Sequence, residues 1–417
     1  MSTARQQISE RLQAVKPRWV GILPAGQAVP ELRGTIGHSG PPMKAEDMLT
    51  VHKHGLIDLL CYEGKVDPRD LSRLVELDGR ERSEEMDRLI NHSFLRSGIS
   101  LRSNWEMNIV APLVGMVSES MPVMIIEDER SKQVVYSPLN EGVGRTVRFG
   151  SLGLDVADRL HWMNGVLAPL LSEALQAAGS IELLPVCQEA LLMGDELHMR
   201  SKAASLLLAA KLTPAILELD RPGEQKAGVI RFLQNNPLFF LNLSMCVSRL
   251  YLKVMEDIQE ECLVTACAAN GVEIGIQVSS KPGRWFTAPA PLPSGSGHGS
   301  GEVAGPVIGD SPVIEAFGWG GRITLLAPGL WPSFGLSGTR EWLAASNRIS
   351  LAAAAALPGV WVPNDFGNAL TVGLVAKKAA HGHVPVRVNT ARLSLDGRFL
   401  GVGSFDIPSH CFQAAIL

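Results

Sequence analysis

The chain has 417 residues, of which 46% are hydrophobic and 19% are charged, and its formal net charge at pH 7 is −4. This composition excludes a mainly disordered chain and is typical of a folded protein with a large core. The acidic balance also argues against general nucleic-acid binding, because such binding needs a basic face.

The N-terminal sequence, the apolar runs and the cysteine spacing do not point to a membrane protein or to an oxidising compartment. The N-terminus lacks the apolar segment of a secretory signal, and no run of about 18 apolar residues predicts a membrane span. None of the six cysteines lies in a CxxC pair, so we expect reduced thiols and neither a structural zinc site nor a disulfide framework. We therefore expect a cytoplasmic protein that contains no metal and no cofactor.

Residues 1–150 mix short strands with helices. The segments "WVGILPA" and "MPVMIIED" are apolar runs of strand length, bounded by Pro, Gly and acidic residues. The segment that begins "VDPRDLSRLVELDG" predicts a helix, with Asp67 as its cap and Pro68 at its first position.

Residues 151–257 predict almost only helices. The segment "LDVADRLHWMNGVLAPLLSEALQAAGS" carries apolar residues at helical spacing and ends near Gly179. A second helix, "SKAASLLLAAKLTPAILELD", is expected to break near Pro214, because proline removes a helix hydrogen bond.

Residues 258–417 return to a mixed pattern. Two strands are expected around the turn signal Asn270-Gly271, a helix at 346–360, and two further strands around Asp396-Gly397. The whole chain therefore predicts an α+β fold, in which mixed α/β domains at residues 1–150 and 258–417 flank an all-helical domain at residues 151–257.

The segment "LLMGDELHMR" concentrates two acids, a histidine and an arginine behind a glycine. If Asp195 begins a helix, Asp195 and His198 share one face, and Glu196 and Arg200 form an i,i+4 pair. Only Asp195 and His198 would then be same-face metal ligands, and no second cluster with ligand spacing completes a site. A helix cap at Asp195 with an exposed Glu196–Arg200 pair is the more ordinary interpretation.

Other polar segments are candidates for anion binding, because guanidinium groups bind planar carboxylates and phosphates with two hydrogen bonds. For each arginine the ordinary alternative is a surface ion pair. The glycine-rich "GWGGR" at 318–322 is either a tight turn or a place where backbone N–H groups approach an anion. The candidates from "SPLNEGVGRTVRFG" and "GRWFTAPAP" are Asn140, Glu141, Arg145, Arg148, Arg284 and Thr287.

Eight segments occur in an order that is typical of one family. They are "SGPPM", "SMPVMII", "LNEGVGRTVRFG", "LLMGDELHMR", "FFLNLSM", "ANGVEIGIQVS", "RWFTAPAP" and "IGDSPVIEAFGWGG". On these segments the chain resembles the AllG (YlbE-like) proteins, which occur beside FdrA-like proteins, from about Trp19 to about Gly403. Eight ordered segments are far more specific than any one of them.

The resemblance implies a subunit of oxamate carbamoyltransferase, an enzyme of anaerobic allantoin breakdown. Its partners would be an FdrA-like subunit, related to succinyl-CoA synthetases, and a third small subunit. The implied reaction interconverts oxalurate plus phosphate with oxamate plus carbamoyl phosphate, from which a carbamate kinase makes ATP. One departure lies at Asn104–Met107, where His-type residues are usual in the family, and it widens the expected substrates to other acyl ureas and amides.

Roles within these segments follow from residue type alone. Phosphorolysis of an acyl urea needs a bound phosphate, donors for a developing oxyanion, and an acid for the leaving nitrogen. Arginines would bind the phosphate and carboxylate, His198 with Glu196 would donate the proton, and asparagines would orient the amide. The full set of expected site residues is Asp195, Glu196 and His198 as catalytic groups, and Asn140, Glu141, Arg145, Arg148, Arg200, Asn242, Asn270, Arg284, Thr287 and Asp310 as substrate-binding groups.

Two other classes of function stay open at this point. In one, the chain is a non-catalytic scaffold or substrate-binding subunit of an FdrA-type complex. In the other, it is a stand-alone, metal-dependent amide hydrolase. A homodimer is also compatible with the sequence.

Overall fold

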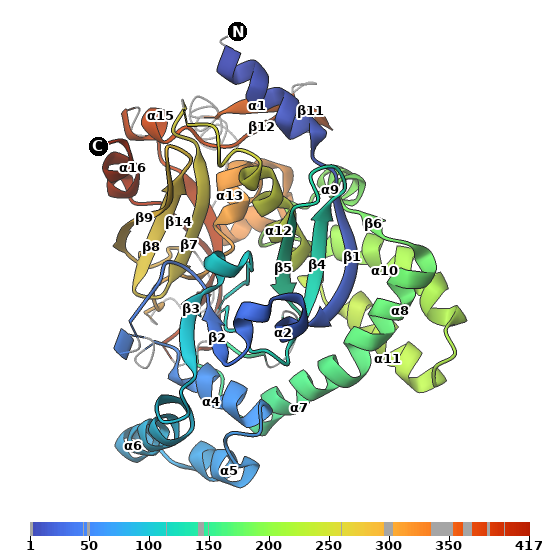
Figure 1. Ribbon diagram of the computed structural model, residues 1–417, viewed down its shortest axis with the longest axis vertical. Coiled ribbons are helices and arrows are strands. Elements are labelled where there is room, and N and C mark those ends of the chain that lie inside the picture. The colour runs from blue at the N-terminus through green and yellow to red at the C-terminus, as the bar shows by residue number, and fades with distance from the viewer. Residues whose placement is uncertain are drawn as a thin grey trace.

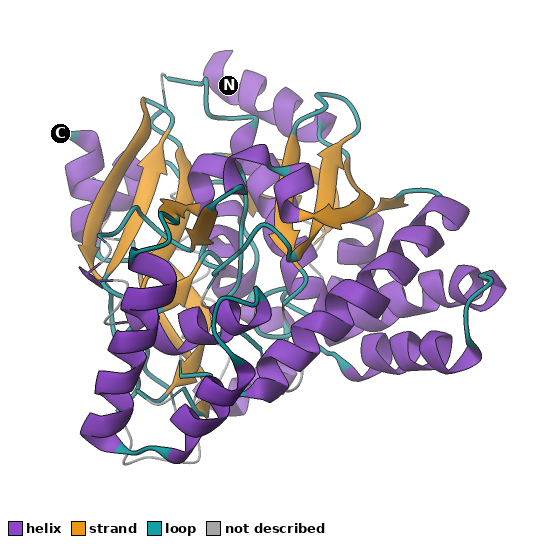
Figure 2. Ribbon diagram, turned by 60° about the horizontal axis from the view of Figure 1, so that its bottom comes forward, coloured by secondary structure: helices purple, strands orange, loops and turns teal. Residues whose placement is uncertain are grey.

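The computed structural model describes residues 3–44, 46–47, 51–113, 115–140, 146–148, 150–259, 261–295, 303–334, 353–361, 369–381, 384–395 and 397–417. Helices are combined with mostly antiparallel sheets, as predicted for an α+β fold (Figures 1 and 2). In the upper part of Figure 1, α12 and α13 lie between two four-stranded sheets.

The first sheet has the order β5-β4-β1-β6 and is antiparallel throughout. Helix α8 packs against β1, and α12 contacts β5, β4 and β1. The two strands predicted in the N-terminal region, β1 and β4, are confirmed and pair with each other. The strands are β1 (Pro17–Pro24), β4 (Pro122–Asp128), β5 (Val134–Pro138) and β6 (Ile181–Glu182).

The second sheet has the order β10-β7-β8-β9, and α16 (Ser409–Ile416) covers β8 and β9. The predicted turn at Asn270-Gly271 joins β7 to β8, and Gly271 has a φ of +88°. A Cβ on Gly271 would lie 2.6 Å from Val51, so this turn requires glycine for conformation and for space. The strands are β7 (Val264–Asn270), β8 (Glu273–Val278), β9 (Lys281–Pro289) and β10 (Ile308–Gly309).

Within the described residues there are also three two-stranded sheets. They are β2 (Thr35–His38) with β3 (Ser100–Ser103), β11 (Ala355–Trp361) with β12 (Ala369–Val372), and β13 (Arg387–Leu393) with β14 (Phe399–Asp406). The last pair confirms the strands expected around Asp396-Gly397, although Asp396 lies outside the described residues. The helix expected at 346–360 is wrong for residues 355–360, because pairing with β12 overrides the helix propensity of the alanines. Its first part, 346–352, lies outside the described residues.

Helices α4, α5 and α6 lie below β2 and β3 at the bottom of Figure 1 and contribute to a separate buried cluster. The predicted cap is confirmed, since the Asp67 carboxylate accepts a hydrogen bond from the N–H of Arg69 at 2.8 Å. The N-terminal helices are α1 (Thr3–Ala14), α2 (Ala25–Ala28), α4 (Lys53–Tyr62), α5 (Pro68–Glu76) and α6 (Gly79–Ile90), which continues as a π-helical turn at Asn91–Leu95.

The regular secondary structure of region 151–257 is helical as predicted, apart from the two-residue strand β6. Gly179 ends α8 with a φ of +79°. The helices are α7 (Leu154–Trp162), a π-helical turn at Met163–Leu167, α8 (Ala168–Ala178), α9 (Leu184–Leu192), α10 (Lys202–Glu218), α11 (Gly223–Asn235) and α12 (Phe239–Lys253).

The helix break predicted at Pro214 is wrong, because α10 runs through it to Glu218. Pro214 lies on the exposed side of the last turns, where the ring meets solvent rather than a packed neighbour. The Thr213 hydroxyl donates a hydrogen bond to the Ala209 carbonyl at 2.7 Å and so adds a partner within the same turn. A single missing N–H therefore does not end the helix.

The C-terminal region adds α13 (Val313–Phe317), α15 (Ala376–His381) and short 3₁₀ turns at Gly320–Arg322 (η5), Thr324–Leu326 (η6) and Pro328–Phe334 (η7). The largest buried cluster combines residues from all three sequence regions, including Trp19, Leu243 and Phe317. The three-domain division stays a proposal about folding units. Within the described ranges, no helix is long and apolar enough to cross a membrane.

Replacing Pro214 by alanine should stabilise the protein. The variant restores an N–H for the Ala210 carbonyl and removes the ring clash, and part of this gain is offset by greater freedom of the unfolded chain. We expect the free energy of unfolding to rise by about 1–2 kcal/mol, measured by urea denaturation. The exposed neighbour Lys211 is the control, since Lys211→Ala should change stability by less than about 0.5 kcal/mol. A destabilised Pro214→Ala protein would contradict this account of α10.

Candidate functional site

The segment Gly194–Arg200 is a buried loop between α9 and α10. Gly194 has a φ of +89°, and the N–H of Asp195 donates to the Ala190 carbonyl at 3.0 Å, so Gly194 ends α9. The predictions that Gly194-Asp195 begins a helix and that Glu196 pairs with Arg200 on an exposed face are therefore wrong. The left-handed glycine closes the preceding helix, and the acids that follow turn inward.

Asp195 caps a helix, but this helix is α10, which begins seven residues further along the chain. Its Oδ2 accepts a hydrogen bond from the N–H of Ala204 at 2.9 Å, and its side chain is fully buried. Burial raises the pKa of Asp195 to about 6, although the Ala204 N–H and the Arg200 charge act in the opposite direction. Arg200 Nε lies 3.5 Å from Oδ1, so the cap also holds the start of the arginine side chain.

The Glu196 carboxylate organises the loop from inside. Its Oε1 accepts hydrogen bonds from the backbone N–H groups of His198 (3.1 Å) and Arg200 (2.7 Å). Its Oε2 accepts one from Asn389 Nδ2 on β13 at 3.2 Å. Burial raises the pKa of Glu196 to about 7. The loop thus wraps around the carboxyl group of Glu196, which also joins the loop to the C-terminal region.

His198 is paired with Glu315 of α13. Nδ1 lies 2.8 Å from Glu315 Oε1, and the imidazole is buried, as is the carboxylate. The same Oε1 accepts hydrogen bonds from the N–H groups of Gly321 (2.8 Å) and Asn389 (3.1 Å). Burial alone lowers the pKa of His198, but the charge of Glu315 and then that of Glu196 raise it above its ordinary value.

The glycine-rich turn at 318–322 meets an anion of its own chain. A Cβ at Gly320 would lie 2.0 Å from Glu315 Oε1, and Gly320 has a φ of +62°. Glycine therefore lets the turn approach the carboxylate closely enough for the Gly321 N–H to bind it. Both interpretations of "GWGGR" therefore apply. The segment is a tight turn, and its Gly321 N–H binds an anionic group, the side chain of Glu315.

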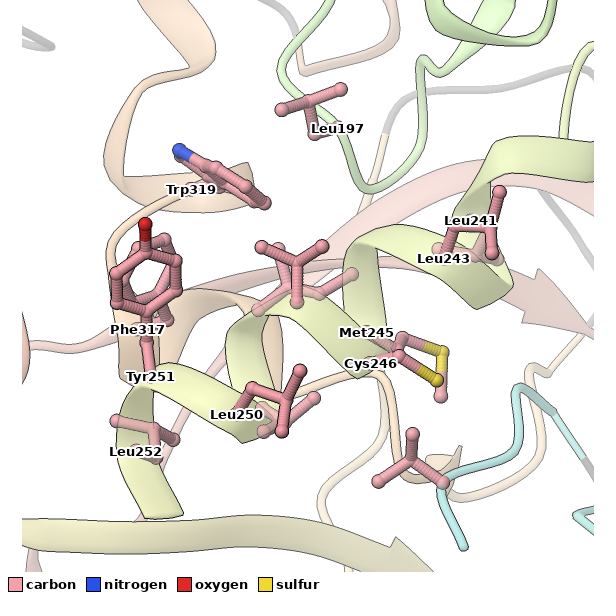
Figure 3. Packing of buried hydrophobic residues seen from close by; sticks show 14 of the residues in the cluster. Leu197, Leu241, Leu243, Met245, Cys246, Leu250, Tyr251, Leu252, Phe317 and Trp319 are labelled. Carbon is pink, nitrogen blue, oxygen red and sulfur yellow. The ribbon is translucent and has the colours of Figure 1, made fainter. Parts of the chain in front are cut away.

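Leu197 anchors the loop in the core. Its carbonyl accepts a hydrogen bond from the Ser244 hydroxyl of α12 at 2.7 Å, and its side chain is fully buried. In Figure 3, Leu197 and Trp319 lie on the same side of α12. Trp319 meets Phe317 edge to face at 4.8 Å, and Phe317 stacks on Tyr251 at 4.7 Å. This packing fixes the loop that leads to Met199 and Arg200.

A cleft of about 510 Å³ begins where the buried network ends. It contains three cationic residues, two hydroxyl residues and an apolar remainder, with no carboxylate among the described lining residues. Its lining consists of Arg148, Arg200 and Lys202, then Thr146 and Ser201, then Leu113, Met199, Pro237, Leu238, Leu330, Ala391, Leu393, Phe399 and Val402. Two predicted residues, Arg148 and Arg200, thus meet in one cleft.

Polar groups near the start of α10 face this cleft. Ser201 is the N-cap residue of α10, and its buried hydroxyl makes no hydrogen bond within the described part of the chain. Arg200 Nε donates to the Gly194 carbonyl at 2.9 Å. A Cβ at Gly329 would lie 3.3 Å from Arg200 Nη1, which places the guanidinium against η7. The cleft therefore combines fixed donors with positive charge.

Asn140 positions the other cationic side of the cleft. Its Nδ2 donates to the Val147 carbonyl at 2.9 Å, and its Oδ1 accepts from the Val147 N–H at 3.2 Å. The side-chain amide of Asn140 thus binds the backbone of Val147, which lies between Thr146 and Arg148. Both of these neighbours line the cleft. Two further expected residues, Glu141 and Arg145, lie outside the described residues.

Besides Asn140, five of the expected substrate-binding residues that the structure describes do not line the cleft. Asn242 Nδ2 donates to the Pro138 carbonyl at 2.6 Å, and Asn270 Nδ2 donates to the Pro41 carbonyl at 2.9 Å. Thr287 donates to Glu273 at 3.0 Å, whereas Arg284 is exposed on β9 above the ring of Phe286. Their hydrogen bonds and ring contact support strands and turns of the fold.

Asp310 ties three segments together away from the cleft. Its oxygens accept hydrogen bonds from the Gly40 N–H (2.7 Å), Trp105 Nε1 (2.8 Å) and the Ala111 N–H (2.9 Å). Burial raises the pKa of Asp310 to about 7, against the effect of these donors. Trp105 belongs to the 3₁₀ turn Asn104–Met107, so the residues that depart from the family pattern lie at a structural junction.

Several residues of the site were missed in the sequence. Ser201 and Lys202 directly follow "LLMGDELHMR", and extending that segment by two positions would have found them. Glu315 lies within "IGDSPVIEAFGWGG". An acidic residue among apolar neighbours there could have indicated a buried, functional carboxyl group. Asn389 carries no signal of its own, because only the fold brings β13 to the loop.

Metal binding has no geometric support in the described residues. No group of three or more His, Cys, Asp or Glu side chains is placed there to hold an ion. All six cysteines are free.

The fold and the site define an α+β protein with a cationic cleft beside a buried carboxylate–histidine network. Residues 99–311 match the family described as oxamate carbamoyltransferase subunit AllG, and the chain belongs to this family. It is 31% identical to the oxamate carbamoyltransferase subunit AllG of Escherichia coli (strain K12), over 100% of this chain and 97% of that protein.

Two further relatives span the whole chain. An uncharacterized protein, YahG, of Escherichia coli (strain K12) is 30% identical over 100% of this chain and 85% of its own length. The crystal structure of a conserved protein of unknown function from Enterococcus faecalis V583 has a TM-score of 0.89 and 29% identity. That match covers 100% of this chain and 96% of the other.

The buried Glu196 carboxyl should make stability depend on pH. Folded Glu196 keeps its proton up to about pH 7, whereas the unfolded chain releases it near 4.5. Its contribution to folding is therefore fully present below about pH 4.5 and is lost as the pH rises through about 7. Because Glu196→Gln cannot titrate, the stability of the wild type relative to the variant should fall by roughly 2–3 kcal/mol between about pH 5 and pH 8.

Urea denaturation across this pH range measures the difference. Glu189→Gln, on the exposed side of α9, is the matched control and should change stability by less than about 0.5 kcal/mol near pH 7. A difference between wild type and Glu196→Gln that stays constant or grows with pH would contradict the protonated, buried Glu196.

Proposed function

We propose that this chain is a subunit of a cytoplasmic, oxamate carbamoyltransferase-like complex. The complex would interconvert oxalurate, or a related acyl urea, plus phosphate with oxamate, or a related amide, plus carbamoyl phosphate. Family membership along the full chain supports the subunit role. The observation that carries the proposal is the cleft with three cationic residues beside the network of Glu196, His198 and Glu315.

The chemistry explains why such a cleft is useful. A phosphate oxygen attacks the carbamoyl carbon, the bond from that carbon to the oxamate nitrogen breaks, and the nitrogen takes a proton. Phosphate and oxalurate are both anions, so bringing them together costs electrostatic energy unless cations lie close by. Arg148, Arg200 and Lys202 supply this charge, and fixed positions of the reactants account for much of the rate.

The buried network acts by holding Arg200 in place. Glu196 binds the Arg200 N–H, Asp195 lies beside Arg200 Nε, and His198 joins the loop to Glu315. His198 is 1% exposed and does not line the cleft, so it has no direct path to a ligand there. We therefore assign Asp195, Glu196 and His198 as positioning residues, in place of the proton donor expected from residue type.

A partner subunit would supply the acid. The described lining residues offer cations and hydroxyls but no carboxyl or imidazole. This favours a complex in which the present chain binds the anions. The FdrA-like subunit and the third small subunit would then supply the remaining catalytic groups. It is also the observation that favours the alternative of a substrate-binding subunit without catalytic groups. The similar identities to AllG and YahG, 31% and 30%, leave the substrate as a proposal.

Reconstitution tests the activity directly. The chain, combined with its FdrA-like partner and the small subunit, should release carbamoyl phosphate from oxalurate or another acyl urea only when phosphate is present. Arg200→Met removes a charge-assisted donor, so kcat/KM should fall by about 10- to 100-fold. Arg231→Met, on the exposed side of α11, is the matched control and should stay near wild type. No carbamoyl phosphate from any acyl urea would refute the proposed reaction.

A His198→Asn variant separates positioning from proton transfer. Asparagine can keep the hydrogen bond to Glu315, because its Nδ2 replaces Nδ1 of the imidazole. If His198 only positions the loop, KM for the anions and kcat both stay within about threefold of wild type. If His198 transfers the proton, kcat falls by about 10²- to 10⁴-fold and the positioning assignment is wrong.

A further inference from the structure

The β13–β14 hairpin presents one apolar face to the cleft. Ala391 pairs with Val402, and Leu393 pairs with Phe399. Paired residues of antiparallel strands lie on the same side of a sheet, so these four side chains share one face. Arg392, between them in sequence, points to the other side and donates to the Gly295 carbonyl at 3.1 Å. The hairpin therefore forms an uncharged wall.

The opposite side of the cleft carries the charge. Arg200, Ser201 and Lys202 lie at the start of α10, and Leu330 of η7 lies next to the position where the Arg200 guanidinium meets Gly329. Cationic and apolar side chains thus lie next to each other in the lining of a cleft of about 510 Å³. Phe399 is 58% exposed, so a large part of this aromatic side chain is not covered by the chain itself.

Oxalurate and oxamate match only the cationic side of this lining. Both are polar throughout, and neither contains a carbon bonded to hydrogen that could cover an apolar wall. Ligand sites combine mainly apolar walls with a few polar groups that orient one end of the ligand. A ligand complementary to this cleft has an anionic head for the cations and an apolar substituent for the hairpin.

We propose that the cleft binds organic carboxylates of the acyl urea or amide class that carry an alkyl or aryl substituent. The carboxylate meets Arg200 and Lys202, and the substituent lies on Leu393 and Phe399. This inference rests on the proposed function, because it assigns the cleft to the substrate of the carbamoyl transfer. It adds the chemical class of that substrate.

A homologous series measures the apolar wall. The probes are malonamate and its 2-ethyl, 2-butyl and 2-hexyl derivatives, which keep one head and lengthen only the tail. Calorimetric titration of the full chain should show Kd falling about threefold to fourfold for each added methylene, since a buried methylene contributes about 0.8 kcal/mol. A flat or rising Kd along the series, or no binding of any member, overturns the inference.

Three variants locate the effect. Phe399→Ala should reduce the gain per methylene, because it removes part of the wall. Lys202→Gln should weaken every member by a similar factor and keep the gain per methylene. Leu292→Ala, an exposed apolar residue outside the lining, is the control and should reproduce the wild-type series. Equal slopes in Phe399→Ala and Leu292→Ala would place the tail elsewhere and overturn the assignment to the hairpin.

The outcome is separable from that of the proposed function. A flat series together with phosphate-dependent carbamoyl phosphate from oxalurate overturns this inference and leaves the carbamoyl transfer standing. A steep series in a complex that releases no carbamoyl phosphate from any acyl urea supports the ligand class and refutes the reaction.

Discussion

One buried carboxylate joins the parts of the molecule that form the site. Glu315 Oε1 receives hydrogen bonds from the imidazole of His198, the N–H of Gly321 and the N–H of Asn389. These donors come from the loop before α10, the glycine-rich turn and β13. Leaving such a carboxylate unpaired in the core would cost several kcal/mol, so the three segments are held in one relative arrangement. Both sides of the cleft, cationic and apolar, continue from these segments.

The fold could be predicted from the sequence where the signal was local. The strands β1 and β4, the cap at Asp67 and the turn at Gly271 follow from apolar runs and turn residues whose preferences need no distant partner. The failures at Pro214 and at residues 355–360 have the opposite cause. The exposure of the Pro214 ring lets α10 continue, and pairing with β12 makes residues 355–360 a strand. Neither effect can be predicted from the neighbouring residues in the sequence.

The site was predictable only in part, for a related reason. The end of "LLMGDELHMR" does line the cleft, but helical spacing gave the segment the wrong geometry, because Gly194 closes one helix rather than opening another. Arg148 and Arg200 were found by residue type. Glu315 and Asn389 lie more than a hundred residues from His198 and Glu196, so their contacts exist only once the sheets and α12 are assembled.

The alternation of side chains along β13 has a consequence for how the protein can change. Asn389, Ala391 and Leu393 project from the same face, so one strand carries both a bond of the buried network and the wall of the cleft. A one-residue slip in the register of the whole of β13, such as an insertion ahead of Asn389 would cause, would turn Arg392 into the cleft and remove Asn389 from Glu196 at the same time. Point substitutions at Ala391, Phe399 or Val402 leave that register intact. Under the proposed function, single substitutions at these positions can therefore change ligand preference, while the length of the strand stays fixed.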